Sequence, residues 1–115
     1  MATINITARD NNGVIINNGS LNTINQTIEL TITLSEAVNT TVSSFTIDDI
    51  CTEGNVSLSN FSGSGTTYTV NAALNGSGTC NFIVFETIFQ SASGYNKRSN
   101  DFKIISYDTT DFYLE

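Results

Sequence analysis

The chain has 115 residues and a formal charge of −7, with eleven acidic residues against four basic ones, no histidine and two cysteines. Without histidine it lacks the usual acid–base group of neutral pH and the imidazole ligands of common zinc sites. Two cysteines are too few for a four-ligand zinc cage, and the acidic excess makes nucleic acid a poor partner. We therefore expect a non-enzymatic protein with no cofactor, no metal centre and no bound nucleic acid.

A length of 115 residues suits one domain, because single domains usually have about 100–150 residues. The longest apolar run, Phe82–Phe85, is far shorter than the roughly 18 residues of a membrane-spanning helix, so we expect no membrane insertion. The start, Met1–Asn5, lacks the basic and apolar regions of a secretory signal. The sequence leaves open whether the chain is used as translated from Met1 or is a repeat excised from a longer protein.

Alternation of apolar and polar residues predicts β-strands along most of the chain. The clearest segment is Gln26–Leu34, where four aliphatic residues alternate with threonine and glutamate. Cys80–Phe85 is apolar on both faces, as expected for a central strand that is covered on both sides. In chain order the predicted strands are Thr3–Thr7, Val14–Ile16, Gln26–Leu34, Ser44–Ile47, Val56–Phe61, Thr67–Leu74, Cys80–Phe85 and Phe102–Tyr107.

Glycine-containing turn signals fall between these strands. Asn12-Gly13, Asn18-Gly19 and Asn75-Gly76 supply the positive φ angles of tight turns, and Ser62–Gly65 links two predicted strands. Short strands with frequent turns are typical of a β-sandwich. The sequence therefore predicts a single all-β domain.

Several motifs from residue 34 onward follow one another in a specific order. This series resembles the bacterial immunoglobulin-like (Big) domains that are repeated along surface adhesins, and the resemblance covers most of the chain. It implies an immunoglobulin-like β-sandwich of about seven antiparallel strands over residues 1–110, a structural or adhesive role, and no catalytic residues. The motifs are LSEAV at Leu34–Val38, FTIDDI at Phe45–Ile50, LSNFSGSGTTYTV at Leu58–Val70 and ISYDTT at Ile105–Thr110.

The chain departs from that family towards its C-terminus. Gln90 stands where the family usually has an acidic residue, and a short tail, residues 111–115, stands where the family continues through a proline into the next repeat. A lone copy with its own Met1 resembles the immunoglobulin-like proteins that decorate phage particles. We therefore expect a decoration or cement protein of the virion surface, whose partners are other protein subunits of the virion or of another surface assembly.

The alternative is an excised repeat of a bacterial adhesin, located at the cell surface or outside the cell. Such a repeat would bind another cell or a surface glycan. Genomic context separates the two hypotheses, because an adhesin repeat requires similar repeats in the same reading frame.

The two cysteines admit two interpretations. The resemblance implies that the strands around Cys51 and Cys80 are antiparallel neighbours, so a cross-strand disulfide is geometrically allowed. It would close a loop of about 30 residues and stabilise the fold by about 2–4 kcal/mol in the chain-entropy model. Assembly in a reducing cytosol would instead leave two free thiols.

Three of the four basic residues, Lys97, Arg98 and Lys103, lie within seven positions. The segment Gly94–Arg98 would present positive charge and a tyrosine to an acidic neighbouring subunit, because Tyr and Arg are common interface anchors; the alternative is a solvated loop. The apolar tail would pack either on a partner or on its own sandwich. The predicted partner contacts are Tyr95, Lys97, Arg98, Phe112, Tyr113 and Leu114.

The acidic pair Asp48-Asp49 would begin a calcium site only if further oxygen ligands joined it. We favour the alternative in which these carboxylates hydrogen-bond the backbone of their own turn. Asp10, Asp108 and Asp111 are interpreted in the same way.

Overall fold

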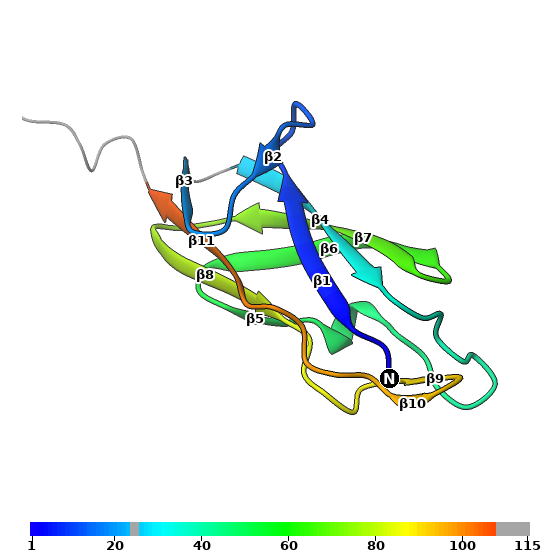
Figure 1. Ribbon diagram of the computed structural model, residues 1–115. Helices are drawn as coiled ribbons and strands as arrows, with labels where there is room; N and C mark the ends of the chain where they lie inside the picture. The colour runs from blue at the N-terminus through cyan, green and yellow to red at the C-terminus, as the bar shows by residue number, and fades with distance from the viewer. Residues whose placement is uncertain (24–25, 108–115) are drawn as a thin grey trace, which may run out of the picture.

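Two β-sheets face each other across one hydrophobic core in the computed structural model, which describes residues 1–23 and 26–107 (Figure 1). The first sheet has the order β2-β1-β4-β7-β6, and its strands are, in that order, Ile15–Ile16, Ile4–Arg9, Gln26–Leu34, Thr67–Leu74 and Val56–Ser64. The second sheet has the order β3-β11-β8-β5, and its strands are Ser20–Thr23, Phe102–Tyr107, Gly78–Ile83 and Cys51–Glu53. The other described elements are a β9–β10 hairpin and one turn of 3-10 helix, η1: Gln90–Ser91, Gly94–Tyr95 and Ile47–Asp49.

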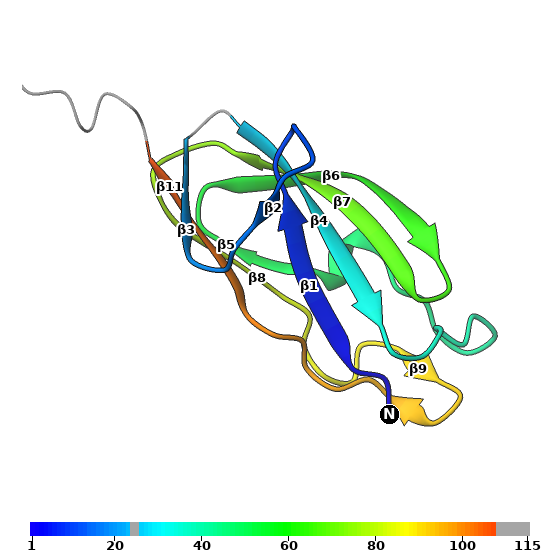
Figure 2. The ribbon, with the colours of Figure 1, turned by 45° about the horizontal axis from the view of Figure 1, so that its top comes forward.

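All paired strands of the described residues are antiparallel except β3 and β11, which are parallel. Figure 2 shows β1, β4, β7 and β6 in one layer and β11, β8 and β5 in the other. The predicted all-β sandwich is therefore confirmed. The predicted domain boundary after residue 110, with a tail at 111–115, lies outside the described residues. Within the described part of the chain, no helix is long and apolar enough to cross a membrane.

The two strands with the clearest alternation, β4 and β7, lie at the centre of the first sheet and have the bounds that the sequence predicts. Leu30 lies opposite Val70, and Ile32 lies opposite Tyr68. Burying one such aliphatic side chain stabilises a fold by roughly 1.5–3 kcal/mol. The buried residues of these strands are Ile28, Leu30, Ile32, Leu34, Tyr68, Val70, Ala72 and Leu74.

A cluster of four aromatic rings joins the loop before η1 to strands β6 and β7. The Phe45 ring lies 5.7 Å from Phe61, 5.1 Å from Tyr68 and 5.6 Å from Phe89, measured between ring centroids. Pairs in these tilted geometries contribute about 0.5–1.5 kcal/mol each beyond their buried area. Burial also raises the pKa of the Tyr68 hydroxyl. The loop is therefore fixed by ring packing rather than by strand pairing.

The predicted strand Ser44–Ile47 is wrong, because the chain there forms an irregular segment that leads into η1. Thr46 N donates to Asp49 Oδ2 at 2.8 Å, and Asp49 N donates to Thr46 O at 3.0 Å. These local bonds close a tight turn and take the place of a ladder with a neighbouring strand.

The predicted strand Cys80–Phe85 is displaced, since β8 ends at Ile83. The amide of Val84 donates to the Ser99 hydroxyl at 2.9 Å, so the backbone leaves the ladder there. Phe85 is 43% exposed, and the expectation of a strand covered on both faces is therefore wrong.

Turn glycines follow the prediction in part. Gly13 and Gly19 have φ of +81° and +83°, as their Asn-Gly pairs predict. The Asn75-Gly76 prediction is wrong, because the positive φ in that connection, +129°, belongs to Gly78. The predicted link at 62–65 is shorter than expected, since β6 continues to Ser64. Strands β3, β5, β9 and β10 were not predicted; they have two to four residues, and of the strands this short only β2 carries an apolar run.

Candidate interaction surface

The segment between β8 and β11 holds the predicted contact residues Tyr95, Lys97 and Arg98, and it is organised by one buried asparagine. Asn96 is fully buried. Its Oδ1 accepts hydrogen bonds from the amides of Ile88 and Phe89 at 2.8 and 2.9 Å. Its Nδ2 donates to the carbonyls of residues 85 and 97 at 2.9 and 2.8 Å. Every donor and acceptor direction of the asparagine amide is thus used to fix the loop.

Two further contacts tie the same segment to the N-terminal residues and to β1 of the other sheet. The amide of Lys97 donates to the Ala2 carbonyl at 2.8 Å. The side chain of Asn100 bonds both backbone groups of Ile6. The segment is therefore a rigid support, while the side chains of Tyr95, Lys97 and Arg98 remain exposed.

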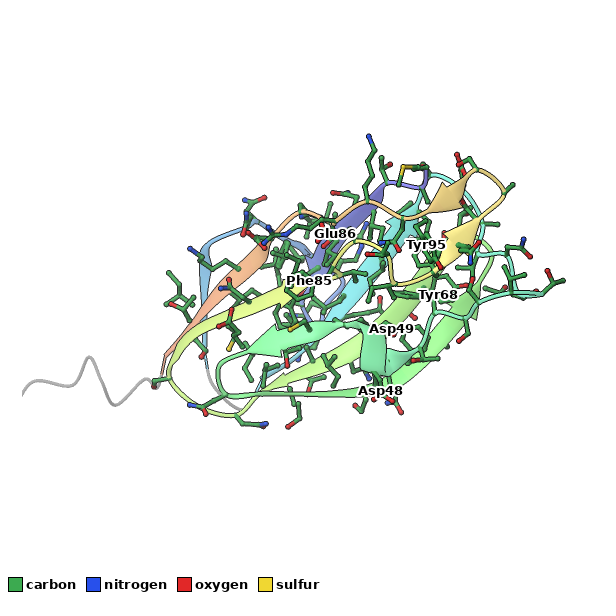
Figure 3. The ribbon with its side chains drawn as sticks, turned by 90° about the horizontal axis from the view of Figure 1, so that it is seen from below. Asp48, Asp49, Tyr68, Phe85, Glu86 and Tyr95 are labelled. Atoms are coloured by element: carbon green, nitrogen blue, oxygen red, sulfur yellow. The ribbon has the colours of Figure 1, made fainter. Side chains whose placement is uncertain are left out.

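Arg98 has two neighbours. Its guanidinium lies 3.4 Å from the Asp101 carboxylate, and its Cζ lies 5.7 Å from the centroid of the Phe85 ring. Both charged side chains are more than half exposed, so the ion pair contributes little to stability. The structure separates the two exposed aromatics of this region, placing Tyr95 on β10 and Phe85 just after β8 (Figure 3).

A groove of about 450 Å³ opens on the outer face of the second sheet, beside Arg98. Strands β5 and β8 and the segment after β8 form it. Its lining combines apolar and charged side chains, and only Arg98 among them was predicted as a contact residue. The lining residues are Cys51, Glu53, Asn81, Ile83, Phe85, Arg98 and Asp101.

The strand register explains how these residues meet. Glu53 lies opposite Asn81 on β8, which in turn lies opposite Lys103 on β11, so the three share one rung of the outer face. The side-chain Oδ1 of Asn81 is buried and has no hydrogen-bond partner among the described residues. A buried acceptor without a hydrogen bond lowers the stability of the folded protein, and a ligand group that donates to Asn81 Oδ1 would remove this cost.

The two thiols are separate. Cys51 is exposed and lies opposite Ile83, whereas Cys80 is buried and lies opposite Ile104. Residues 80 and 83 are three positions apart on β8, so their side chains point to opposite faces of the second sheet. Cys51 shares the face of its partner Ile83, and the two thiols therefore lie on opposite faces of the sheet. The disulfide interpretation is therefore contradicted, and the structure has the free thiols of the alternative.

Two of the acidic candidates, Asp49 and Asp10, bond the backbone of their own turns. Asp49 closes η1, and Figure 3 shows Asp48 and Asp49 together there. Asp10 Oδ1 accepts from the amides of Asn12 and Val14, both at 2.9 Å. Among residues 1–23 and 26–107 no cluster of three or more His, Cys, Asp or Glu side chains gathers as for a metal ion.

One carboxylate braces the β9–β10 hairpin. Glu36 Oε1 accepts from the hydroxyls of Ser91 and Ser93 at 2.6 Å each, and its other oxygen lies 3.8 Å from the N-terminal ammonium of Met1. The two hydroxyls hold the pKa of Glu36 below its usual range. The remaining predicted residues, Asp108, Asp111, Phe112, Tyr113 and Leu114, lie outside the described residues.

Comparison with known protein families and curated proteins yields no match. Five of the groove residues were not predicted as site residues: Glu53, Asn81, Ile83, Phe85 and Asp101. The sequence held one local sign of the groove: the apolar run continues from Ile83 to Phe85, past the end of the buried strand.

Proposed function

We propose that the chain is a bacterial-type immunoglobulin-like domain that acts as a non-enzymatic structural protein of a phage virion surface. The strand order supports the immunoglobulin-like part of the proposal, and the virion role rests on the resemblance of the sequence to the immunoglobulin-like proteins that decorate phage particles. The series β1-β4-β7-β6 and β11-β8-β5 has the order of the two sheets of a constant-type immunoglobulin domain, in which strands A, B, E and D form one sheet and G, F and C the other. The motif series of the sequence resembles the same class.

In this proposal the domain joins neighbouring subunits through side chains displayed on a rigid loop, a common arrangement for contact residues on β-sandwich scaffolds. The exposed Tyr95 supplies apolar area with a polar tip, and Lys97 and Arg98 meet acidic side chains of the neighbour. The tail residues Phe112, Tyr113 and Leu114 add apolar contact.

Purified particles of the phage that carries the gene provide the test. Mass spectrometry is expected to find the chain in these particles. Tyr95→Ala and Lys97→Glu are expected to lower its copy number, whereas Val14→Ala, which alters an exposed side chain in the turn between β1 and β2, leaves it unchanged. Absence of the chain from the particles would overturn the virion proposal.

A second candidate is a repeat of a bacterial adhesin at the cell surface or outside the cell, with another cell or a surface glycan as its partner. The open groove beside Phe85 favours it, because binding modules present concave sites with an aromatic and a few polar groups. Sequencing of the full reading frame tests this candidate. Tandem copies of the domain are expected, and a frame without them would reject it.

A further inference from the structure

We propose that the groove between β5, β8 and Arg98 binds one neutral saccharide ring of a glycan. The proposal rests on the lining of the groove. It deepens the adhesin candidate, whose partner is a surface glycan, and it would hold for a decorating protein as well. A volume of about 450 Å³ lies within the range of small-ligand sites, roughly 300–1,000 Å³.

The apolar part of the groove suits the C–H face of a sugar ring. Phe85 is 43% exposed two residues after the end of β8, and Ile83, which is 7% exposed, lies in the lining with it. A large exposed aromatic beside a concave surface is typical of a recognition site. A saccharide presents one apolar face of C–H groups, and this face can lie on the side of the Phe85 ring away from the Arg98 guanidinium, whose Cζ lies 5.7 Å from the ring centroid.

The polar part of the groove suits hydroxyl groups. The carboxylates of Glu53 and Asp101 accept hydrogen bonds, and the Arg98 guanidinium donates them. The Arg98–Asp101 contact, at 3.4 Å between exposed groups, leaves most of the hydrogen-bonding capacity of both side chains unused. Neighbouring hydroxyls on a sugar ring each donate and accept hydrogen bonds. They match this combination of carboxylates and a guanidinium better than a ligand group that only donates or only accepts.

Asn81 strengthens the argument. Its buried Oδ1 has no partner among the described residues and lies between the exposed Glu53 and Lys103 on the same rung. A hydroxyl that enters as these long side chains move aside would supply the missing hydrogen bond. Binding would then relieve a cost that the free protein bears.

The charges of the lining select against the other ligand classes. Two carboxylates face one guanidinium, so phosphate, sulfate and sialic acid would meet repulsion, which the net charge of −7 increases. Arg98 opposes a cationic ligand, and the four charged or amide side chains oppose an aliphatic one. A neutral ring with hydroxyls on its edge is the class that remains.

A titration followed by amide NMR tests the proposal on the full chain. Glucose, galactose, N-acetylglucosamine and rhamnose are each added to millimolar concentration. At least one is expected to give saturable shifts at the amides of Ile83, Phe85 and Arg98. Phe85→Ala is expected to weaken this binding about tenfold, because truncation of a central aromatic anchor removes a large share of the binding energy.

Tyr95→Ala is the matched control, since Tyr95 is equally aromatic and 46% exposed but lies outside the groove. Asp101→Asn, which leaves an exposed position polar, is expected to weaken binding without loss of folding. No saturable shift with any of the four sugars overturns the proposal, as does an equal loss in Tyr95→Ala. A chain that is absent from virions yet gives the shifts would reject the virion role and support the saccharide site.

Discussion

The side-chain amide of Asn100 pairs with the backbone of Ile6 as a neighbouring strand residue would. Asn100 Oδ1 accepts from Ile6 N at 2.7 Å, and Asn100 Nδ2 donates to Ile6 O at 3.1 Å. One side chain thus satisfies both backbone groups of a residue in β1 and links the segment before β11 to the opposite sheet. An amide fits this place because it carries one acceptor and one donor on the same planar group.

Asn100→Asp is expected to lower the free energy of unfolding by about 2 kcal/mol at neutral pH, because a carboxylate oxygen would then face the Ile6 carbonyl. Below about pH 3.9 the aspartic acid is protonated and can donate, so the difference from the wild type should shrink as pH falls. Urea unfolding at both pH values measures the effect. Asn12→Asp, in an exposed turn, controls for the added charge; equal losses in both variants would contradict the pairing.

Asn96→Ala is expected to lower the free energy of unfolding by about 3 kcal/mol or more, because four backbone groups lose their partner in a buried place. Amide hydrogen exchange at Ile88 and Phe89 should speed up. Asn11→Ala, which changes an exposed asparagine, should have little effect. A loss below about 1 kcal/mol would mean that the loop is held by other contacts.

Thr87→Asn is expected to raise the free energy of unfolding by about 0.5–1 kcal/mol. Thr87 has φ of +61°, a conformation that is strained for a β-branched residue and tolerated by asparagine. Thermal unfolding measures the change. Thr40→Asn, at an exposed position without positive φ, is the control, and a gain of the same size there would remove the strain explanation.

Glu36 is expected to give a stability contribution that depends on pH. Its pKa in the folded protein lies below the ordinary value of 4.5 because the Ser91 and Ser93 hydroxyls bond the carboxylate. The contribution is therefore fully present above the unfolded pKa and is lost as pH falls through the folded pKa. A carboxyl NMR titration should give a value below 4.5 that rises in the Ser91→Ala/Ser93→Ala variant. Ser59→Ala should leave it unchanged, and a rise in that control would exclude the hydroxyls as the cause.

Cys51 is expected to react with an alkylating reagent in the folded protein, whereas Cys80, which is 1% exposed, should react only after unfolding. Intact mass measured before and after denaturation, without reductant, counts the modified thiols. Cys51→Ser should abolish the reaction of the folded protein. Absence of reactive thiols after denaturation would show a disulfide and contradict the structure.

The strands that the sequence predicts well are those whose pattern is local. β4 and β7 have four buried residues each at a spacing of two, and this alternation fixes both their bounds and their inner face. The strand predicted at Ser44–Ile47 was wrong because Phe45 has strand-like neighbours in the sequence. In the structure Phe45 is buried by other aromatic rings and not in a paired strand.

The groove could not be predicted from the sequence because its members are distant along the chain. Glu53, Phe85 and Asp101 meet only through the register of β5 on β8 and the path of the segment after β8. The buried role of Asn96 was equally hidden, since an asparagine beside Tyr95 and Lys97 has the composition of an ordinary polar loop.

The parallel pairing of β3 with β11 has a mechanical consequence. Met1 lies near the β9–β10 hairpin, whereas β11 ends at the far end of the sandwich (Figure 1). A pull between Met1 and Tyr107 would load β1 first and, once β1 and β2 have come away, would draw β3 and β11 past each other along their length. Their hydrogen bonds, from Ser20–Ile104 to Thr23–Tyr107, would carry the load together in shear instead of opening one after another. This short patch would act as a clamp that slows forced unfolding, whose rate is set by the unfolding barrier.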